Sequence, residues 1–173
     1  MFKIGDTVLY GSDGVCKISE VTKKVFGGTE IDYYVLTPVF DNRSTIFVPI
    51  KNKKLTDKMK SILNAEDIYK IICEVEDEPQ WIKSDPERSE VFKNIVSGGD
   101  LKAVIRLIKS VCIHRDEVLK NGKKLHKSDE AAFKDAVRIL YEELSLTLKI
   151  SKEDIGDIVC RKVPFDTLIN KTV

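Results

Sequence analysis

The stretch that decides the fold of the first third of the chain is FKIGDTVLYG, residues 2–11, which is followed by Gly14-Val15. It contains the β-branched and aromatic run Thr7–Tyr10, and Asp13-Gly14 then provides a turn signal. Short apolar runs of this kind, separated by glycine and aspartate, are typical of strands. We therefore expect the chain to begin with a β-sheet.

The same pattern continues to about residue 53. It predicts strands over residues 6–10, 15–21, 32–37 and 45–48. Gly27-Gly28 lies between two of these runs and indicates a hairpin turn. Four or five short strands within so few residues predict a small, strongly bent, barrel-like sheet.

After Lys51-Asn52-Lys53-Lys54 the apolar residues recur at the helical period of 3.6, so everything downstream is predicted to be helical. Helix starts are expected at four polar residues, and Gly98-Gly99 is expected to end a helix. Those starts are Asn64, Ser84 before Asp85-Pro86, Ser128 before a helix that runs to about Lys149, and Ser151. The sequence therefore predicts an α+β protein with a β domain over residues 1–53 and a helical domain over residues 54–173, whose tail after about residue 163 is weakly patterned.

Composition indicates a folded protein. Of 173 residues, 42% are hydrophobic and 33% are charged, and the formal net charge is +1. No run approaches the roughly 18 apolar residues of a membrane span, and the first residues lack the apolar stretch of a signal peptide. We expect a cytoplasmic protein without a membrane partner. The four cysteines, which are far apart in sequence, are interpreted as reduced and mostly buried.

The small net charge hides an uneven distribution. Residues 102–127 contain eight lysines and arginines against two acids, whereas residues 74–100 contain eight acids against three basic residues. A locally basic segment is typical of a surface that binds nucleic acid, although most charge runs are solvated turns.

Sequence motifs for catalysis are missing. The chain has no glycine-rich phosphate loop, zinc-protease motif, nucleophile elbow or acidic metal cluster. His114 and His126 lie beside Arg115 and Lys127, without a clear carboxylate to orient either ring. A Cys112–His114 pair is conceivable, but adjacent helix positions do not face each other. We expect no enzymatic activity and no metal or organic cofactor; a small enzyme with a novel site is the disfavoured alternative.

Residues 2–11 with Gly14-Val15 resemble the opening of the CarD and CdnL family of transcription regulators. The resemblance continues through Tyr33-Tyr34-Val35-Leu36 and through residues 45–49, Thr-Ile-Phe-Val-Pro. In this family the β domain is Tudor-like and is similar to the polymerase-interaction module of the transcription-repair coupling factor. A tryptophan after a turn, Ser97-Gly98-Gly99-Asp100 and residues 138–144 resemble the family's helical domain, so the likeness extends from about residue 2 to about residue 160.

The resemblance implies a bacterial regulator that binds the β subunit of RNA polymerase, is monomeric when bound, and contacts promoter DNA at the upstream fork of the transcription bubble. An exposed edge strand would pair with a strand of the polymerase. By position, the polymerase contacts would be Lys24, Arg43, Ile46, Phe47, Val48 and Pro49. The DNA contacts would be Trp81, Lys83, Arg88, Lys123, Lys124 and Lys127.

Three of these assignments have structural alternatives. Phe47 stands at a position that is commonly basic in the family, and it could belong to the core instead. Trp81 could act as a wedge beside the unstacked base step, or it could pack between helices. The lysines of residues 120–127 could contact phosphates or form a solvated turn.

The segment after Trp81 also departs from the family, because acids are interleaved with its basic residues. The acids Asp85, Glu87 and Glu90 would have to point away from DNA. The main alternative function is therefore a polymerase- or protein-interaction module that does not engage DNA.

Overall fold

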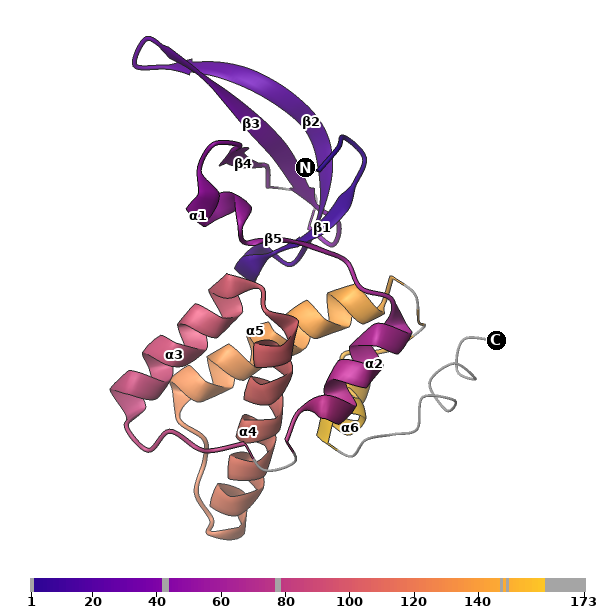
Figure 1. The fold of residues 1–173 in the computed structure, drawn as a ribbon. Coiled ribbons are helices and arrows are strands. Elements are labelled where there is room, and N and C mark those ends of the chain that lie inside the picture. The colour runs from indigo at the N-terminus through magenta and orange to yellow at the C-terminus, as the bar shows by residue number, and fades with distance from the viewer. Residues whose placement is uncertain (1, 42–43, 77–78, 147, 149, 161–173) are drawn as a thin grey trace. The chain divides into compact units, whose positions relative to one another are not determined.

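The computed structural model describes residues 2–41, 44–76, 79–146, 148 and 150–160 (Figure 1). The chain divides into a β unit, Met1–Ile62, and a helical unit, Leu63–Val173. The α+β prediction is confirmed. The predicted domain boundary at residue 53 lies before the end of the compact β unit, because a last strand downstream of it pairs with the first one.

The β unit is built on a five-stranded antiparallel sheet with the order β4-β3-β2-β1-β5. Its elements are β1 (Thr7–Tyr10), the 3₁₀ helix η1 (Gly11–Asp13), β2 (Val15–Phe26), β3 (Thr29–Pro38), β4 (Ile46–Pro49), α1 (Lys53–Thr56) and β5 (Met59–Ser61). The expected hairpin turn is present between β2 and β3, where Gly27 and Gly28 have φ angles of 57° and 79°. Two consecutive positive φ angles suit the tight turn of a twisted hairpin and favour glycine at both positions.

Two details of the β unit differ from the sequence prediction. β2 and β3 extend beyond the predicted strands and form a long, curved ribbon (Figure 1). Met59–Ser61, which was predicted to be helical, is a strand that pairs with β1. The helical prediction was wrong there because three residues are too few to reveal a period, and pairing with β1 decides their conformation.

One face of the sheet carries the core of the β unit. Its buried residues are Val8, Tyr10, Cys16, Ile18, Tyr34, Leu36, Val48 and Met59. Side chains alternate along a strand, so the neighbours of these residues point to the opposite face. In β4, Val48 is fully buried, whereas the adjacent Phe47 is 41% exposed.

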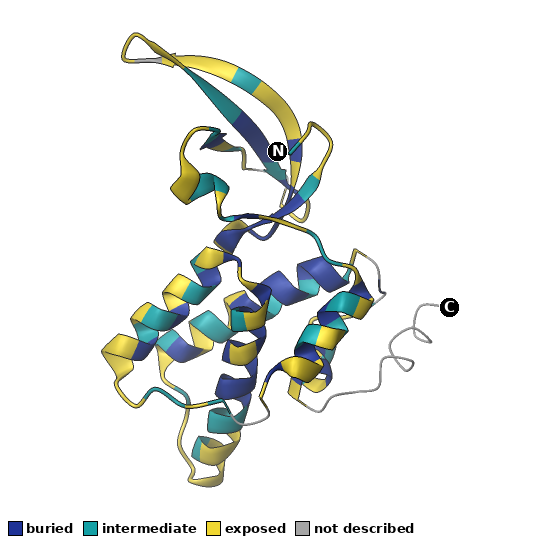
Figure 2. Cartoon of the chain, viewed as in Figure 1, coloured by how far each residue is buried: buried dark blue, intermediate teal, exposed yellow. Residues whose placement is uncertain are grey.

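The helical unit is arranged around α4 (Leu101–Lys120), which contacts each of the other four helices among the described residues. Those helices are α2 (Ala65–Glu74), α3 (Asp85–Gly98), α5 (Lys127–Leu144) and α6 (Asp154–Cys160). The buried residues of α4 lie between Leu101 and Cys112 (Figure 2). The predicted starts at Asn64 and Ser84 are confirmed, and Gly99 ends α3 in the left-handed conformation. The start of α5 differs, because the side chain of His126 rather than Ser128 caps the helix.

α5 ends at Leu144, before the expected end near Lys149, because Ser145 and Leu146 form a turn. The tail after residue 163 lies outside the described residues. The predicted pairing of Ser151 with Asp154 is present as one half of a capping box, since Asp154 accepts hydrogen bonds of 2.8 and 3.0 Å from the backbone N–H and the hydroxyl of Ser151. The N–H of Asp154, the first residue of α6, donates to the Ser151 carbonyl at 3.3 Å.

The interpretation of the cysteines was wrong in part. Cys112 on α4 and Cys160 at the end of α6 form a disulfide, while Cys16 and Cys73 are free. Cys16 and Cys112 are buried, but Cys73 and Cys160 are exposed. A separation of 48 residues gives no sequence signal for the pair, because the packing of α6 against α4 is what brings the two sulfurs together.

Candidate functional site

The edge strand β4 is the first candidate interface. It pairs with β3 on one side, with Phe47 opposite Val35 and Ile46 opposite Leu36. Within the part of the chain that the structure describes, no strand pairs with its other side. Backbone N–H and C=O groups on an unpaired side are the groups to which a partner strand binds.

Phe47 and Lys24, both predicted as polymerase contacts, lie together on the face of the sheet opposite the core. The Nζ atom of Lys24 is 3.4 Å from the centre of the Phe47 ring, and Tyr33 contacts that ring edge-on with a centroid distance of 6.2 Å. The lysine is within the range of a cation–π interaction. The alternative that Phe47 belongs to the core is therefore wrong.

The other predicted polymerase contacts differ in accessibility. Val48 is fully buried, so its side chain belongs to the core and its backbone alone remains for a partner. Ile46 packs partly against the core, and Pro49 is half-buried. Arg43 lies outside the described residues.

Trp81 precedes α3 and is held within the helical unit by three side chains. Its ring stacks on His114 of α4 with centroids 3.8 Å apart and an interplanar angle of 18°. Phe92 contacts it edge-on at 6.1 Å, and the guanidinium carbon of Arg88 is 4.4 Å from the ring centre. Trp81 is only half-buried, so it packs between helices while part of its surface stays accessible.

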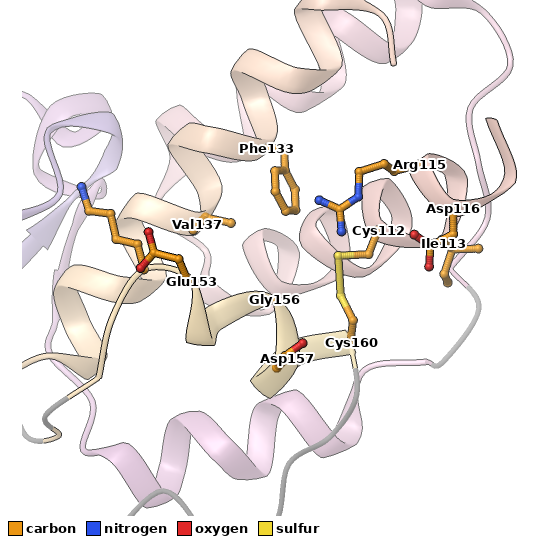
Figure 3. A pocket seen from close by; sticks show the side chains of 11 residues that line it. Cys112, Ile113, Arg115, Asp116, Phe133, Val137, Glu153, Gly156, Asp157 and Cys160 are labelled. Carbon is orange, nitrogen blue, oxygen red and sulfur yellow. A yellow bond between two sulfur atoms is a disulfide. The ribbon is translucent and has the colours of Figure 1, made fainter. Parts of the chain in front are cut away.

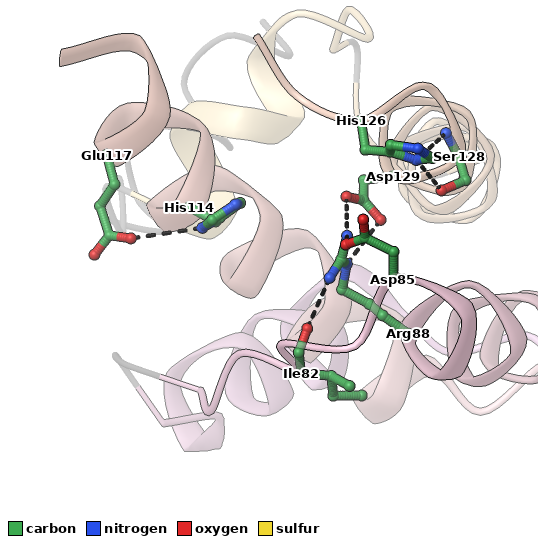
Figure 4. A network of polar contacts seen from close by, with 8 residues as sticks. All are labelled: Ile82, Asp85, Arg88, His114, Glu117, His126, Ser128 and Asp129. Atoms are coloured by element: carbon green, nitrogen blue, oxygen red, sulfur yellow. Dashed lines mark hydrogen bonds and ion pairs between the residues drawn. The ribbon is translucent and has the colours of Figure 1, made fainter. Parts of the chain in front are cut away.

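Arg88 is a buried structural residue rather than a surface cation. It is 3% exposed, and it donates hydrogen bonds of 2.9 and 2.7 Å to the two carboxylate oxygens of Asp129 (Figure 4). It also donates to Asp85 at 2.7 Å and to the carbonyl of Ile82, the residue after Trp81, at 2.8 Å. Each guanidinium nitrogen of this buried residue donates to an acceptor within the protein, so the prediction that Arg88 contacts DNA is corrected.

One of the acids of α3 has a partner that the sequence analysis did not assign. Asp85 belongs to the Arg88 network. The hydrogen bond from Arg88 lowers the pKa of Asp85. The ion pair with Arg88 compensates the charge of Asp85.

The two histidines have partners that the sequence did not reveal. His114 lies with Nδ1 3.5 Å from Oε2 of Glu117, one helical turn away, in addition to its stack on Trp81. The Nδ1 atom of His126 is 2.7 Å from the Ser128 hydroxyl and accepts a bond from the Ser128 N–H (Figure 4). Both rings therefore have local structural roles, and Cys112, whose pairing with His114 the sequence analysis disfavoured, is in the disulfide.

The predicted lysine contacts are all exposed. Lys123 and Lys124 lie in the turn between α4 and α5, Lys127 is the first residue of α5, and Lys83 follows the tryptophan segment. The Arg88–Asp129 pair connects the start of α3 with the first turn of α5 across 41 residues. Because Arg88 also bonds the carbonyl of Ile82, this pair holds the segment that carries Trp81 near the first turn of α5, which begins at Lys127.

Sequence reasoning missed Asp129 and His114, the partners that hold this arrangement. Asp85 and Arg88 are three residues apart on a predicted helix, so their pairing could have been inferred from spacing. Asp129 and His114 lie on other helices, and no local pattern connects them with Trp81.

A catalytic alternative would need a pocket with a perturbed carboxylate. Burial raises the pKa of Glu143 to about 7, but this residue is not among those that line the cavity between α4, α5 and α6. Among the described residues, no group of three or more His, Cys, Asp or Glu side chains is placed to hold a metal ion. No helix in the described ranges is both long and apolar enough to cross a bilayer.

Comparison with known proteins identifies the first unit. None of the curated proteins matches the chain. Residues 2–63 match the family model of the CarD-like/TRCF RID domain, and this range coincides with the compact β unit that ends at Ile62. The resemblance seen in residues 2–11 and 45–49 is thus confirmed for this unit. The N-terminal unit of the chain is a CarD-like/TRCF RID domain, an RNA polymerase-interaction module.

Proposed function

We propose that the protein is a bacterial transcription regulator that binds the β subunit of RNA polymerase through β4 and contacts promoter DNA through its helical unit. In this proposal it acts in the cytoplasm at the upstream edge of the transcription bubble and changes the stability of the open complex. The single observation that carries the proposal is the match of residues 2–63 to the RID domain. The side of its edge strand β4 that no described strand pairs with is consistent with it.

The surface around β4 supports strand pairing with a protein partner. Phe47, Tyr33 and Lys24 form a solvent-accessible group beside the free backbone edge. Backbone pairing would supply affinity, and an aromatic ring with an adjacent cation would supply specificity. Aromatic residues are enriched at the centres of protein interfaces.

The exposed lysines and the aromatic ring of Trp81 support the proposal that the helical unit contacts DNA. Lys123, Lys124 and Lys127 are exposed there, and lysines at a surface neutralise phosphates irrespective of sequence. His114, on which Trp81 stacks, is six residues before Lys120, a distance of about 9 Å along a helix. An aromatic ring and a group of lysines on one helical unit suit a site where duplex meets unstacked DNA.

The test is binding of the full chain to RNA polymerase core enzyme, followed by measurement of open-complex lifetime on a promoter. The proposal expects a complex with core enzyme in the absence of DNA and an altered lifetime when the protein is added. Absence of binding to core enzyme would overturn it at the first step.

The second candidate function is an interaction module that binds polymerase or another protein without DNA. It is favoured by Glu87 and Glu90, which are exposed on α3 downstream of Trp81. Binding to core enzyme with an unchanged open-complex lifetime, and without salt-dependent DNA affinity, would select this function.

We also propose that the protein acts by binding alone and has no catalytic activity. The basis is the absence of catalytic motifs from the sequence, together with a family match to an interaction domain. Turnover that is abolished by a change at His114 would overturn this part of the proposal.

A further inference from the structure

The disulfide between Cys112 and Cys160 joins the central helix α4 to α6. α6 also packs against the unit through the buried side chains Ile155, Ile158 and Val159. Because apolar contacts already dock this helix, the disulfide adds a covalent connection to a helix that is packed without it. Such a bond can open while the surrounding fold persists.

The disulfide lines a cavity of about 410 Å³ between α4, α5 and α6 (Figure 3). A volume of this size is within the usual range for small-molecule sites. Charges of both signs surround it, with Arg115 and Lys152 as the cations and Asp116, Glu153 and Asp157 as the acids. The guanidinium of Arg115 lies 5.4 Å from the centre of the Phe133 ring, so an aromatic face also lines the cavity.

The two cysteines of the disulfide differ in accessibility. Cys112 is 4% exposed, whereas Cys160 is an exposed residue at the end of α6. We take the more exposed residue, Cys160, as the one that a nucleophile in the cavity attacks. Arg115 is one helical turn from Cys112, where neighbouring side chains lie on the same face, so its positive charge would stabilise a departing Cys112 thiolate.

We propose that this cavity is a thiol–disulfide exchange site for a small zwitterionic thiol of the amino-acid or short-peptide class. The cations bind the carboxylate of such a molecule and the acids bind its ammonium group. A disulfide in a reducing compartment is usually transient, and this part of the reasoning rests on the proposed cytoplasmic function.

The exchange is balanced in atoms and electrons. The thiolate of the small molecule attacks Sγ of Cys160, the bond between the two cysteines breaks, and Cys112 leaves as a thiolate that takes a proton from water. A second thiolate attacks the small molecule's sulfur in the mixed disulfide and releases the thiolate of Cys160. Two small thiols thus supply two electrons and become one small disulfide, and the reverse reaction closes the bond between Cys112 and Cys160.

The first test equilibrates the full chain with buffers of reduced and oxidised glutathione, then traps thiols with an alkylating agent in denaturant and counts them by mass spectrometry. The oxidised protein should carry two labels, on Cys16 and Cys73, and the reduced protein should carry four. The variant Cys73→Ser should lose one label in both states without shifting the midpoint. Four labels at every buffer ratio, or two labels even at a large excess of reduced thiol, would overturn the proposal.

The second test asks whether the cavity recognises the thiol. Arg115→Gln should lower the rate of reduction by glutathione several-fold more than the rate of reduction by the uncharged thiol 2-mercaptoethanol, because the stabilisation of the departing Cys112 thiolate is lost for both thiols and the binding of a carboxylate is lost for glutathione alone. Lys93→Gln, a change at an exposed residue of α3, should affect neither rate. An equal effect of Arg115→Gln on both thiols, or no effect on either, would overturn recognition by the cavity. Neither assay contains polymerase, so failure here is distinguishable from failure of the proposed function.

Discussion

The carboxylate of Glu143 accepts a hydrogen bond of 2.8 Å from the backbone N–H of Leu63, a residue 80 positions earlier in the chain. Glu143 is 1% exposed, and among the described atoms its second carboxylate oxygen has no hydrogen-bond partner. Burial raises the pKa of Glu143 from 4.5 to about 7, although the bond from Leu63 acts in the opposite direction. The contact ties the first residue of the helical unit to α5.

This contact predicts that stability falls as pH rises. Because the pKa of Glu143 is higher in the folded chain, the folded state binds more protons than the unfolded state between pH 4.5 and about 7. The stability conferred by the protonated form is complete below this window and is lost as pH rises through about 7. The difference in pKa corresponds to roughly 3 kcal/mol of unfolding free energy.

Urea denaturation of Glu143→Gln at several pH values measures the effect. The variant should lack this pH dependence and should gain on the parent protein as pH rises through the window. Glu90→Gln, which neutralises an exposed carboxylate on α3, should follow the parent. If Glu143→Gln and the parent lose stability in parallel, Glu143 does not titrate in this range.

The buried Arg88–Asp129 pair predicts a large loss of stability from single substitutions. Arg88 is 3% exposed, and Asp129→Ala removes the main partner of its guanidinium. The free energy of unfolding, measured by urea denaturation, should therefore fall by about 3–5 kcal/mol. Arg88→Met combined with Asp129→Leu should cost clearly less than the sum of the single changes, because neither charge is left unpaired. Lys134→Ala, which breaks an exposed pair with Glu130, should change stability by no more than about 0.5 kcal/mol. If the double substitution lowers the free energy of unfolding by the sum of the two single substitutions, the two side chains do not act as a pair.

The difference between the predicted and the observed role of Arg88 shows what the sequence could and could not reveal. Strand alternation, glycine turns and helix caps are local signals, and they were enough to predict the α+β fold, the start of α2 and the end of α3. They also placed Phe47 beside Val48 on a strand, but which of the two faces the core depends on register against β3. Arg88 looked like a surface cation because its partner Asp129 lies on another helix, 41 residues away. The same limit concealed the Cys112–Cys160 disulfide and β5, since both are created by contacts between distant segments.

The exposed face of β4 predicts that Phe47→Glu weakens binding to polymerase core enzyme. Phe47 is 41% exposed and Lys24 lies over its ring, so the introduced carboxylate can be accommodated without unfolding the β unit. We expect a loss in affinity of at least about tenfold, or ~1.4 kcal/mol, in a titration. Leu119→Glu, an equal charge change at an exposed apolar residue of α4, should bind like the parent. Undiminished binding by a folded Phe47→Glu protein would remove β4 as the contact.

The lysines between α4 and α5 predict a salt-dependent contribution to DNA affinity. Replacing Lys123, Lys124 and Lys127 by Gln should lower binding to any sequence and reduce the slope of log affinity against log salt by about one for each lost phosphate contact. Fluorescence anisotropy at several salt concentrations gives this slope. Lys93→Gln on α3 should leave it unchanged, and an unchanged slope in the triple variant would assign these lysines to a solvated turn.

For Trp81 we predict an effect on the lifetime of the open complex rather than on the slope of log affinity against log salt. The ring carries no charge, so Trp81→Ala should leave the salt dependence of DNA binding unchanged. A wedge stabilises an unstacked base step rather than the duplex, so its loss should shorten the lifetime of open complexes. The same ring stacks on His114 and contacts Phe92, so its removal should also lower the stability of the helical unit. Trp81→Phe separates the two roles.

In Trp81→Phe an aromatic face is kept for the stack on His114, while the area available to a base step is smaller. Urea denaturation should therefore place Trp81→Phe close to the parent, whereas open-complex lifetimes should fall between those of the parent and Trp81→Ala. Arg88 fixes the carbonyl of Ile82 in each variant, so the segment that carries residue 81 keeps its position. If both variants fold and their open complexes persist as long as those of the parent, Trp81 is a packing residue alone. That outcome would favour the interaction module that does not engage DNA.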